Sequence, residues 1–328
     1  MLKKTVSLFL TALLLAACLA GCGGTGTPSE GGDAPRIVVT VFPLYDWILR
    51  ILGDNPAGAR VTLLLDNGVD LHSFQPTAKD ILNVSACDVF VCVGGESDKW
   101  TEDVLKEASN KDMIVLRLLP ALGDRAREEE LAEGMQTDPE GSEEEDGPEY
   151  DEHIWLSLKN AAFLTGVLAE ALGKADPEHA SLYAANAAAY REELLSLGAE
   201  YAAAVDAAEF GTLLCADRFP FLYLTKDYGL RYYAAFLGCS AETEASFETI
   251  AFLAGKADEL RLPAVLTIEG SDHRIAETVV RTSRDPGRKI LTLDSMQSAT
   301  GKSGESYLSA MRSNLDVLKE ALGTKEAE

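Results

Sequence analysis

The strongest constraint on the fold of this 328-residue chain is a set of short apolar runs that alternate with longer helical patterns. Runs rich in Val, Ile and Leu are typical of strands that are buried on both faces, and their alternation with helices predicts parallel sheets covered by helices. The runs form two groups of four, which predicts two lobes. We expect strands at 36–42, 59–65, 88–93 and 113–118 in the first group, and at 211–216, 231–236, 264–268 and 289–293 in the second.

A proline-free stretch between the two groups predicts one long helix. Residues 178–208 are dense in Ala, Glu, Leu and Tyr. Pro177 fits the first turn of this helix, and Asp176 fits its N-cap. Roughly 30 residues at about 1.5 Å each give a rod of about 45 Å, long enough to reach from one lobe to the other. We therefore expect an α/β fold of two Rossmann-like lobes at 36–175 and 209–328, each a four-stranded parallel sheet with flanking helices, joined by a rigid spine helix at 176–208.

The first residues have the pattern of an export signal. Lys3 and Lys4 precede an apolar run at 6–19, and the sequence then reads Ala20-Gly21-Cys22. A basic start, an apolar stretch and small residues before the cut are typical of a secretory signal, and the run is shorter than the roughly 20 residues that a membrane-spanning helix needs. The ending resembles a bacterial lipobox, which implies cleavage before Cys22 and lipidation of this cysteine. A plain signal peptide with a chance cysteine is the alternative.

This pattern predicts where the mature protein resides. We expect a signal peptide at 1–21 and a flexible, glycine-rich tether at 22–35. The mature chain would be exported, extracytoplasmic and lipid-anchored to the cell membrane.

The net charge of −24 bears on the possible ligands. Nucleic acid is excluded as a partner, because binding phosphates needs clustered Lys and Arg. The charge favours small cations, although solubility alone could explain an acidic surface. Residues 124–152 contain 14 acidic and 2 basic side chains without apolar periodicity. This composition predicts a disordered acidic loop at about 124–150, with a solvated insertion as the simplest interpretation.

Four cysteines remain after the export signal and the lipidation site, and none belongs to a C-x-x-C motif. A zinc knuckle is therefore excluded. Cys87 and Cys92 would face opposite sides of a strand, which argues against a disulfide between them. Cys215 and Cys239 could pair in an extracytoplasmic setting, and the sequence leaves this open.

Polar residues gather where the predicted strands end, which is where open α/β sheets bind ligands. Two of the chain's four histidines are among them, and a second histidine near an acid strengthens the case for a metal site over that of a single structural histidine. Imidazole favours zinc, iron or nickel, and carboxylate also admits manganese. The residues at these ends are Asp66, Asp70, His72, His153, Asp217, Arg218, Glu242, Glu244, Glu269 and Asp294.

Four segments carry a resemblance to a known family. Asp70-Leu71-His72-Ser73-Phe74-Gln75-Pro76-Thr77 resembles the Asp-Pro-His-x-x-Glu-Pro-Thr motif of the metal-binding proteins of zinc and manganese ABC importers, and Asp151-Glu152-His153-Ile154-Trp155-Leu156 resembles their Asp-Pro-His-x-Trp-Leu motif. Tyr228-Gly229-Leu230 and Leu291-Thr292-Leu293-Asp294 are similar to two further segments of this zinc-uptake periplasmic-binding-protein family. Both histidine motifs lack the family's proline, and Gln75 replaces its glutamate.

The resemblance implies a set of metal ligands. His72, His153 and Asp294 would bind the ion. The third ligand position of the family falls on Arg218, which stays protonated and cannot coordinate a cation. We expect Asp217 to replace it, with Arg218 neutralising nearby carboxylates or orienting Asp217. Glu242, Glu244 and Glu269 are the alternatives, as ligands or as groups that support the ligands.

The implied function is that of a receptor without enzymatic activity. It would bind Zn²⁺, favoured over Mn²⁺, in the cleft between the lobes and deliver it to an ABC-type import permease. The permease and its ATPase would be separate subunits, and the receptor is expected to be a monomer. A zinc-dependent hydrolase with an open coordination position and a surface adhesin with a structural metal are the alternatives.

Overall fold

The computed structural model describes residues 34–136, 149–240 and 244–325. The described residues from Pro35 onward form one compact unit. The expected signal peptide and the lipidation site at Cys22 lie outside the described residues. Within the described part of the chain, none of the helices combines the length and the apolar character needed to cross a membrane.

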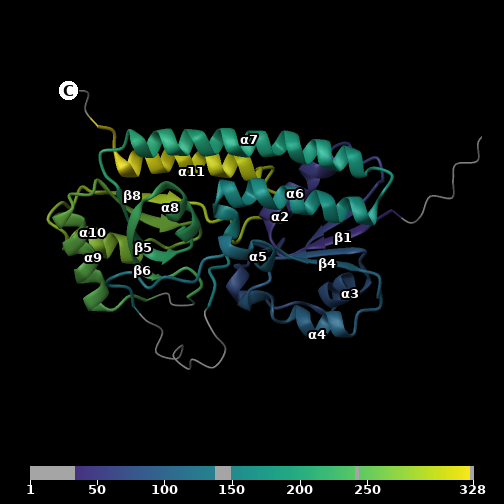
Figure 1. The fold of residues 1–328 in the computed structure, drawn as a ribbon. Helices are drawn as coiled ribbons and strands as arrows, with labels where there is room; N and C mark the ends of the chain where they lie inside the picture. Colours follow the sequence, from purple (N-terminus) through teal and green to yellow (C-terminus); the bar gives the residue numbers. More distant parts are fainter. Residues whose placement is uncertain (1–33, 137–148, 241–243, 326–328) are drawn as a thin grey trace, which may run out of the picture. The chain divides into compact units, whose positions relative to one another are not determined.

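The first half of the chain builds a parallel four-stranded sheet with the order β2-β1-β3-β4 (Figure 1). The register places Ile37 opposite Val61 on one side and Val89 on the other. The strands are β1 (Arg36–Val39), β2 (Arg60–Leu63), β3 (Val89–Cys92) and β4 (Ile114–Arg117). The helices of this half are α2 (Phe42–Leu52), α3 (Ala78–Ala86), α4 (Thr101–Lys106) and the short α5 (Leu118–Ala121).

The second half repeats this topology with the order β6-β5-β7-β8. All its strand pairs are parallel, and β5 contains a register shift between Cys215 and Arg218. Its elements are β5 (Thr212–Phe219), α8 (Leu222–Tyr228), β6 (Arg231–Leu237), α9 (Phe247–Glu259), β7 (Ala264–Ile268), α10 (Arg274–Thr282) and β8 (Lys289–Leu293). In each sheet the strand order reverses beside the first strand, which is where such sheets bind ligands at their carboxyl ends.

Three longer helices pack together through α7. They are α6 (Leu158–Ala175), α7 (Ala180–Asp206) and α11 (Tyr307–Leu322). Helix α7 runs alongside α6 and α11 (Figure 1), and its Tyr201 hydroxyl donates to the backbone oxygen of Met311 at 2.6 Å. The predicted α/β fold, with two four-stranded parallel sheets and a long linking helix, is confirmed.

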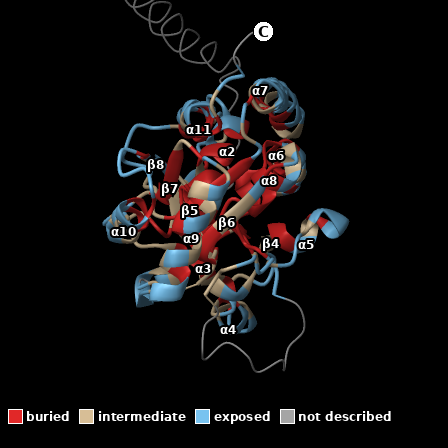
Figure 2. Ribbon diagram, turned by 90° about the vertical axis from the view of Figure 1, so that its left-hand side faces the viewer, coloured by how far each residue is buried: buried red, intermediate tan, exposed pale blue. Residues whose placement is uncertain are grey.

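The hydrophobic core explains why these elements stay together. One large cluster of buried side chains contains residues from both sheets and from α2, α6, α7 and α11, including Trp47, Trp155 and Tyr307. A smaller cluster lies under α9 and α10. Figure 2 shows the buried residues in the interior and exposed ones on the outer helix faces.

Two details of the helices differ from the expectation. Helix α7 begins at Ala180 with His179 at its N-cap, whereas Pro177 lies in the preceding turn. Asp176 is not the cap, because its carboxylate accepts hydrogen bonds from the side chains of His179 (2.8 Å) and Tyr183 (2.6 Å). Helices α8 and α11 are additions to the predicted elements.

Candidate metal centre

His72 is positioned by a short turn after β2. This 3-10 turn, Leu71–Ser73, begins at Asp70, whose carboxylate accepts a hydrogen bond from the backbone N–H of His72 at 2.9 Å. The Nδ1 atom of His72 lies 2.9 Å from the hydroxyl of Ser97, which follows β3. With Nδ1 engaged in this way, the Nε2 atom is left to face the centre of the site.

His153 precedes the 3-10 turn Ile154–Leu156 and is fully buried. Asp151 holds it twice, by accepting from its backbone N–H at 2.7 Å and by contacting its Nδ1 at 3.0 Å. A carboxylate on Nδ1 is the usual partner of a metal-binding histidine, because it fixes the tautomer that presents a free Nε2 lone pair. Trp155 closes one side, with its ring centroid 5.5 Å from that of His153.

The two Nε2 atoms lie 3.1 Å apart. In a tetrahedral zinc site with Zn–N bonds of about 2.0–2.1 Å, the ligand nitrogens are about 3.3 Å apart. The histidine pair, His72 and His153, is therefore already spaced as two ligands of one ion.

Burial and neighbouring charges set the protonation of the histidine pair. Burial, together with the nearby His153 and Arg218 charges, lowers the pKa of His72 to about 3, so its imidazole is neutral at neutral pH. Burial also acts to lower the pKa of His153, but the charges of Asp151, Glu152 and Glu129 outweigh it and leave this pKa raised. The pair can thus accept a cation at the cost of at most one proton.

The second sheet meets the histidine pair through Arg218 and Gln297. Arg218 donates to Asp70 at 2.8 Å, and the charge of Arg218 holds the pKa of Asp70 below its usual range against the effect of burial. Gln297 follows β8. With its amide nitrogen toward Asp70, it donates to both carboxylate oxygens (3.2 and 3.0 Å), and its amide oxygen lies 3.1 Å from Nε2 of His153.

Cys239, after β6, completes a cluster with the histidine pair. A ring nitrogen of each histidine and the Sγ atom of Cys239 all lie within 4.8 Å of one another, and among the described residues these three are the group that could hold a metal ion. Burial raises the pKa of this thiol, and the charges of Glu129 and Asp151 raise it further. This role has no signal in the sequence, because an isolated cysteine has no ligand spacing.

The other residues proposed from the sequence lie around this cluster without belonging to it. Asp217 lies inside β5, not after it, and accepts from the backbone N–H of Arg218 at 2.9 Å. The carboxylate of Asp294 accepts from Met296 N–H at 2.8 Å. Asp66 forms an ion pair with Lys302 at 2.6 Å. Glu244 is exposed, and Glu242 lies outside the described residues.

Glu269 supports the loop that carries Gln297. Its carboxylate accepts from the backbone N–H of Ser295 (2.7 Å) and of Gln297 (3.2 Å) and from the Ser295 hydroxyl (2.6 Å). Burial, with the nearby Asp294 charge, raises its pKa to about 7. Glu269 therefore orients the loop that carries Gln297 through these three hydrogen bonds.

The flanks of the acidic segment are ordered against the second half of the chain, which corrects the expectation of disorder over about 124–150. Glu128 and Tyr150 form an antiparallel bridge, and Gln136 donates its backbone N–H to Ala235 at 2.9 Å. Glu129 accepts from the backbone N–H of Cys239 at 3.1 Å. The central part of this segment, 137–148, lies outside the described residues.

The cysteines form no disulfide within the described part of the chain. Cys215 is fully buried and Cys239 partly buried, and both are free. The pairing that the sequence left open is therefore absent, and the thiol of Cys239 is available for other chemistry.

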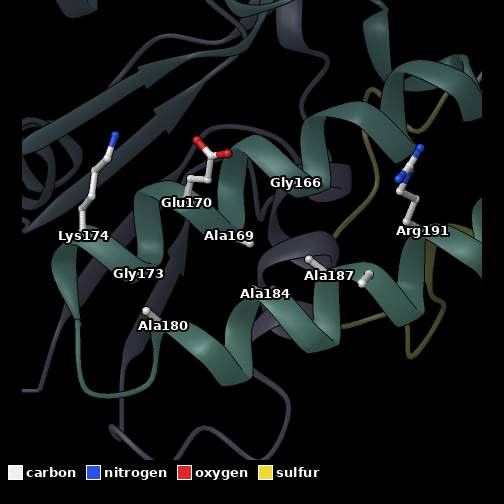
Figure 3. Close-up of a pocket in the computed structure, with 10 residues that line it drawn as sticks. Gly166, Ala169, Glu170, Gly173, Lys174, Ala180, Ala184, Ala187 and Arg191 are labelled. Carbon is white, nitrogen blue, oxygen red and sulfur yellow. The ribbon is translucent and has the colours of Figure 1, made fainter.

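A groove of about 510 Å³ lies between α6 and α7, away from the histidine pair (Figure 3). Its floor consists of alanines and glycines, and Glu170, Lys174 and Arg191 project at its edge (Figure 3). Small residues allow close helix approach here, since a Cβ on Gly173 would lie 3.0 Å from that of Ala180. The lining contains neither histidine nor cysteine, so the groove offers no alternative site for a transition metal.

Comparison with known proteins places this geometry in context. A protein-family model described as "Zinc-uptake complex component A periplasmic" matches residues 37–321. The chain is 30% identical over 322 residues to the zinc-binding lipoprotein AdcA of Streptococcus pneumoniae, covering 97% of this chain and 61% of AdcA. It is 27% identical over 334 residues to the high-affinity zinc uptake system protein ZnuA of Bacillus subtilis, covering 99% of this chain and 100% of that protein.

The solved structures agree with the fold. The Zn(II)-bound ZnuA-like domain of S. pneumoniae AdcA superposes with a TM-score of 0.69 at 27% identity, covering 88% of this chain and 99% of that domain. The chain is also 27% identical to the zinc-binding protein AdcA of Streptococcus pyogenes over 87% of its own length. It spans about half of that protein, 55% of its length.

Proposed function

This chain belongs to the family of zinc-uptake complex component A proteins, and on that premise we propose that it is an extracytoplasmic receptor for a divalent transition metal. Zn²⁺ is favoured over Mn²⁺ as the ion it carries. The receptor catalyses no reaction of its own and delivers the ion to an ABC-type import permease.

The histidine pair is the observation that carries this proposal. Two Nε2 atoms 3.1 Å apart, each on a ring whose Nδ1 is held by another side chain, suit one shared ion. Both rings belong to short turns with side chains buried among fixed partners, so little ordering is needed when the ion binds.

Additional ligands would come from the second half of the chain. Asp294 and Asp217 stay candidates as oxygen donors. Each now holds a backbone N–H of its own loop or strand, so either would have to turn toward the ion.

The partners follow from the proposed role. Uptake of the metal into a cell requires a membrane permease and a separate ATPase. We propose that this chain docks on the permease as a monomer. Lipidation at Cys22 would keep it at the cell membrane.

Growth on scarce metal tests this function. A strain lacking the gene should grow poorly in medium stripped of zinc, and added zinc should rescue it at lower concentration than added manganese. A gene carrying both His72→Ala and His153→Ala should fail to complement at wild-type protein levels. Full complementation by this double variant would contradict the proposal.

A further inference from the structure

We propose that the thiolate of Cys239 is the third protein ligand of the ion at the histidine pair, and that it makes the receptor selective for thiophilic ions such as Zn²⁺ over Mn²⁺. This inference rests on the proposed function and specifies the metal class that the site accepts.

The loop after β6 is built to bring Cys239 against the histidines. A Cβ on Gly238 would lie 3.1 Å from Cε1 of His153 and 3.0 Å from the backbone oxygen of Phe219, so only a glycine lets the chain pass this close without displacement. The backbone N–H of Cys239 donates to Glu129 at 3.1 Å. The loop is thus held from two sides.

The thiol lies beside the pair and takes part in no disulfide. Its Sγ lies within 4.8 Å of a nitrogen of both histidines, and its hydrogen bond with the backbone of Glu152 acts to lower the pKa of the thiol against the effect of burial. In a tetrahedral zinc site of two imidazoles and one thiolate, the ligand atoms lie about 3.3–3.6 Å apart. A movement of the Cys239 Sγ toward the histidine nitrogens on the order of 1 Å is therefore enough to complete the site.

Arg218 explains why an anionic ligand is needed from elsewhere. Its guanidinium is paired with Asp70 at 2.8 Å, and its other terminal nitrogen donates to the backbone oxygen of Ser240 at 3.4 Å. This pair engages Asp70 and places a cation beside the site. Cys239, next to Ser240 in the same loop, lies close enough to the histidine pair to supply negative charge directly to the ion.

The chemistry of the donor determines the metal. When the ion binds, the thiol loses its proton to solvent and a sulfur–metal bond forms, with no change in oxidation state. Thiolate and imidazole together favour Zn²⁺, whereas Mn²⁺ prefers carboxylate and water. A carboxylate in this position would make the difference between the two ions smaller.

Three variants separate this inference from its alternatives. In Cys239→Ser, Zn²⁺ affinity should fall at least tenfold in a chelator competition, whereas Mn²⁺ affinity should change less than threefold. Asp217→Asn tests the competing ligand and should change Zn²⁺ affinity less than threefold. Cys87→Ser is the matched control, because a serine hydroxyl can still donate to Val84 as the Cys87 thiol does.

A spectroscopic readout reports the bond directly. Wild-type protein loaded with Co²⁺ should show the near-ultraviolet sulfur-to-cobalt charge-transfer band, which Cys87→Ser retains and Cys239→Ser loses. Thermal unfolding of the metal-free variants verifies that each is folded.

The possible failures are distinguishable. Tight Zn²⁺ binding that needs both histidines but is unaffected by Cys239→Ser, without the cobalt band in wild type, would overturn the thiolate ligand and leave the receptor function standing. Absence of Zn²⁺ binding by the wild-type protein would overturn both.

Discussion

At the scale of single residues, the two histidines reach the same chemical form by different routes. Burial keeps His72 neutral, with its pKa lowered to about 3. His153 keeps a raised pKa because the charge of Asp151 outweighs its burial. Of the two histidines, His153 is therefore the one at which protons compete with metal, and Asp151 both orients this ring and strengthens the competition.

The pH dependence of metal binding follows from this asymmetry. Because the pKa of His153 lies above its usual value near 6.5, protonation of His153 should begin to lower Zn²⁺ affinity already above pH 6.5 as the pH is lowered, in addition to the proton that the Cys239 thiol releases. Asp151→Asn removes the charge that raises the pKa of His153, so the loss of Zn²⁺ affinity should begin at a lower pH. At pH 8, loss of the carboxylate should weaken binding by about tenfold. Titrations from pH 5.5 to 8 check both effects, and an unchanged pH profile in Asp151→Asn would contradict this account.

Much of the site could be predicted from individual residues, and the remainder depends on packing. His72 and His153 stand in motifs with acids at fixed spacing, so the sequence alone proposes them as ligands, and the structure places their Nε2 atoms 3.1 Å apart. Cys239 has no such motif, and it joins them only because Gly238 allows its loop to touch His153. The engagement of Arg218 with Asp70, 148 residues apart, has no local signal either.

At the scale of elements, the loop that follows β6 is the most sensitive part of the site. Gly238→Ala places a methyl group 3.0–3.2 Å from Phe219 and His153, so the loop or the ring must shift. We expect a five- to tenfold loss of Zn²⁺ affinity with little change in stability. Gly255→Ala in α9, where the added methyl group meets nothing within 4 Å, is the control and should stabilise the helix by about 1 kcal/mol. Equal Zn²⁺ affinity in both variants would show that the metal site does not depend on the close contact of this loop with His153 and Phe219.

The flanks and the centre of the acidic segment should differ in importance. Replacing 137–148 with a short Gly-Ser linker retains the contact of Glu129 with Cys239, so Zn²⁺ affinity should change less than threefold. Replacing 127–149 removes that contact and should weaken binding at least tenfold. Isothermal titration calorimetry with Zn²⁺ measures both affinities. A large loss of Zn²⁺ affinity on replacing 137–148 would mean that the centre of the segment supplies a ligand.

The strands could be predicted well, and the helices less completely. Buried parallel strands are continuous apolar runs, so β7 and β8 have the predicted bounds. The predicted fifth strand was too short, because β5 continues through a register shift into the polar Asp217 and Arg218. Helix α11 was missed, although Tyr307, Met311, Leu315, Leu318 and Leu322 follow a helical period.

At the scale of the whole molecule, the core connects the two halves. One hydrophobic cluster includes residues of both sheets, α7 and α11. We expect the described unit to unfold in a single cooperative transition in calorimetry. Zn²⁺ should raise the midpoint by mass action, and should raise it much less in His72→Ala. Two separate transitions in the wild-type protein would contradict a shared core.

The most direct test of the receptor account is a zinc titration of the wild-type chain beside His72→Ala and His153→Ala. The account predicts one Zn²⁺ bound per wild-type chain and an affinity at least tenfold lower in each variant, with the fold retained, because each change removes one of two nitrogens that face each other at 3.1 Å. Unchanged affinity and stoichiometry in either variant would contradict it.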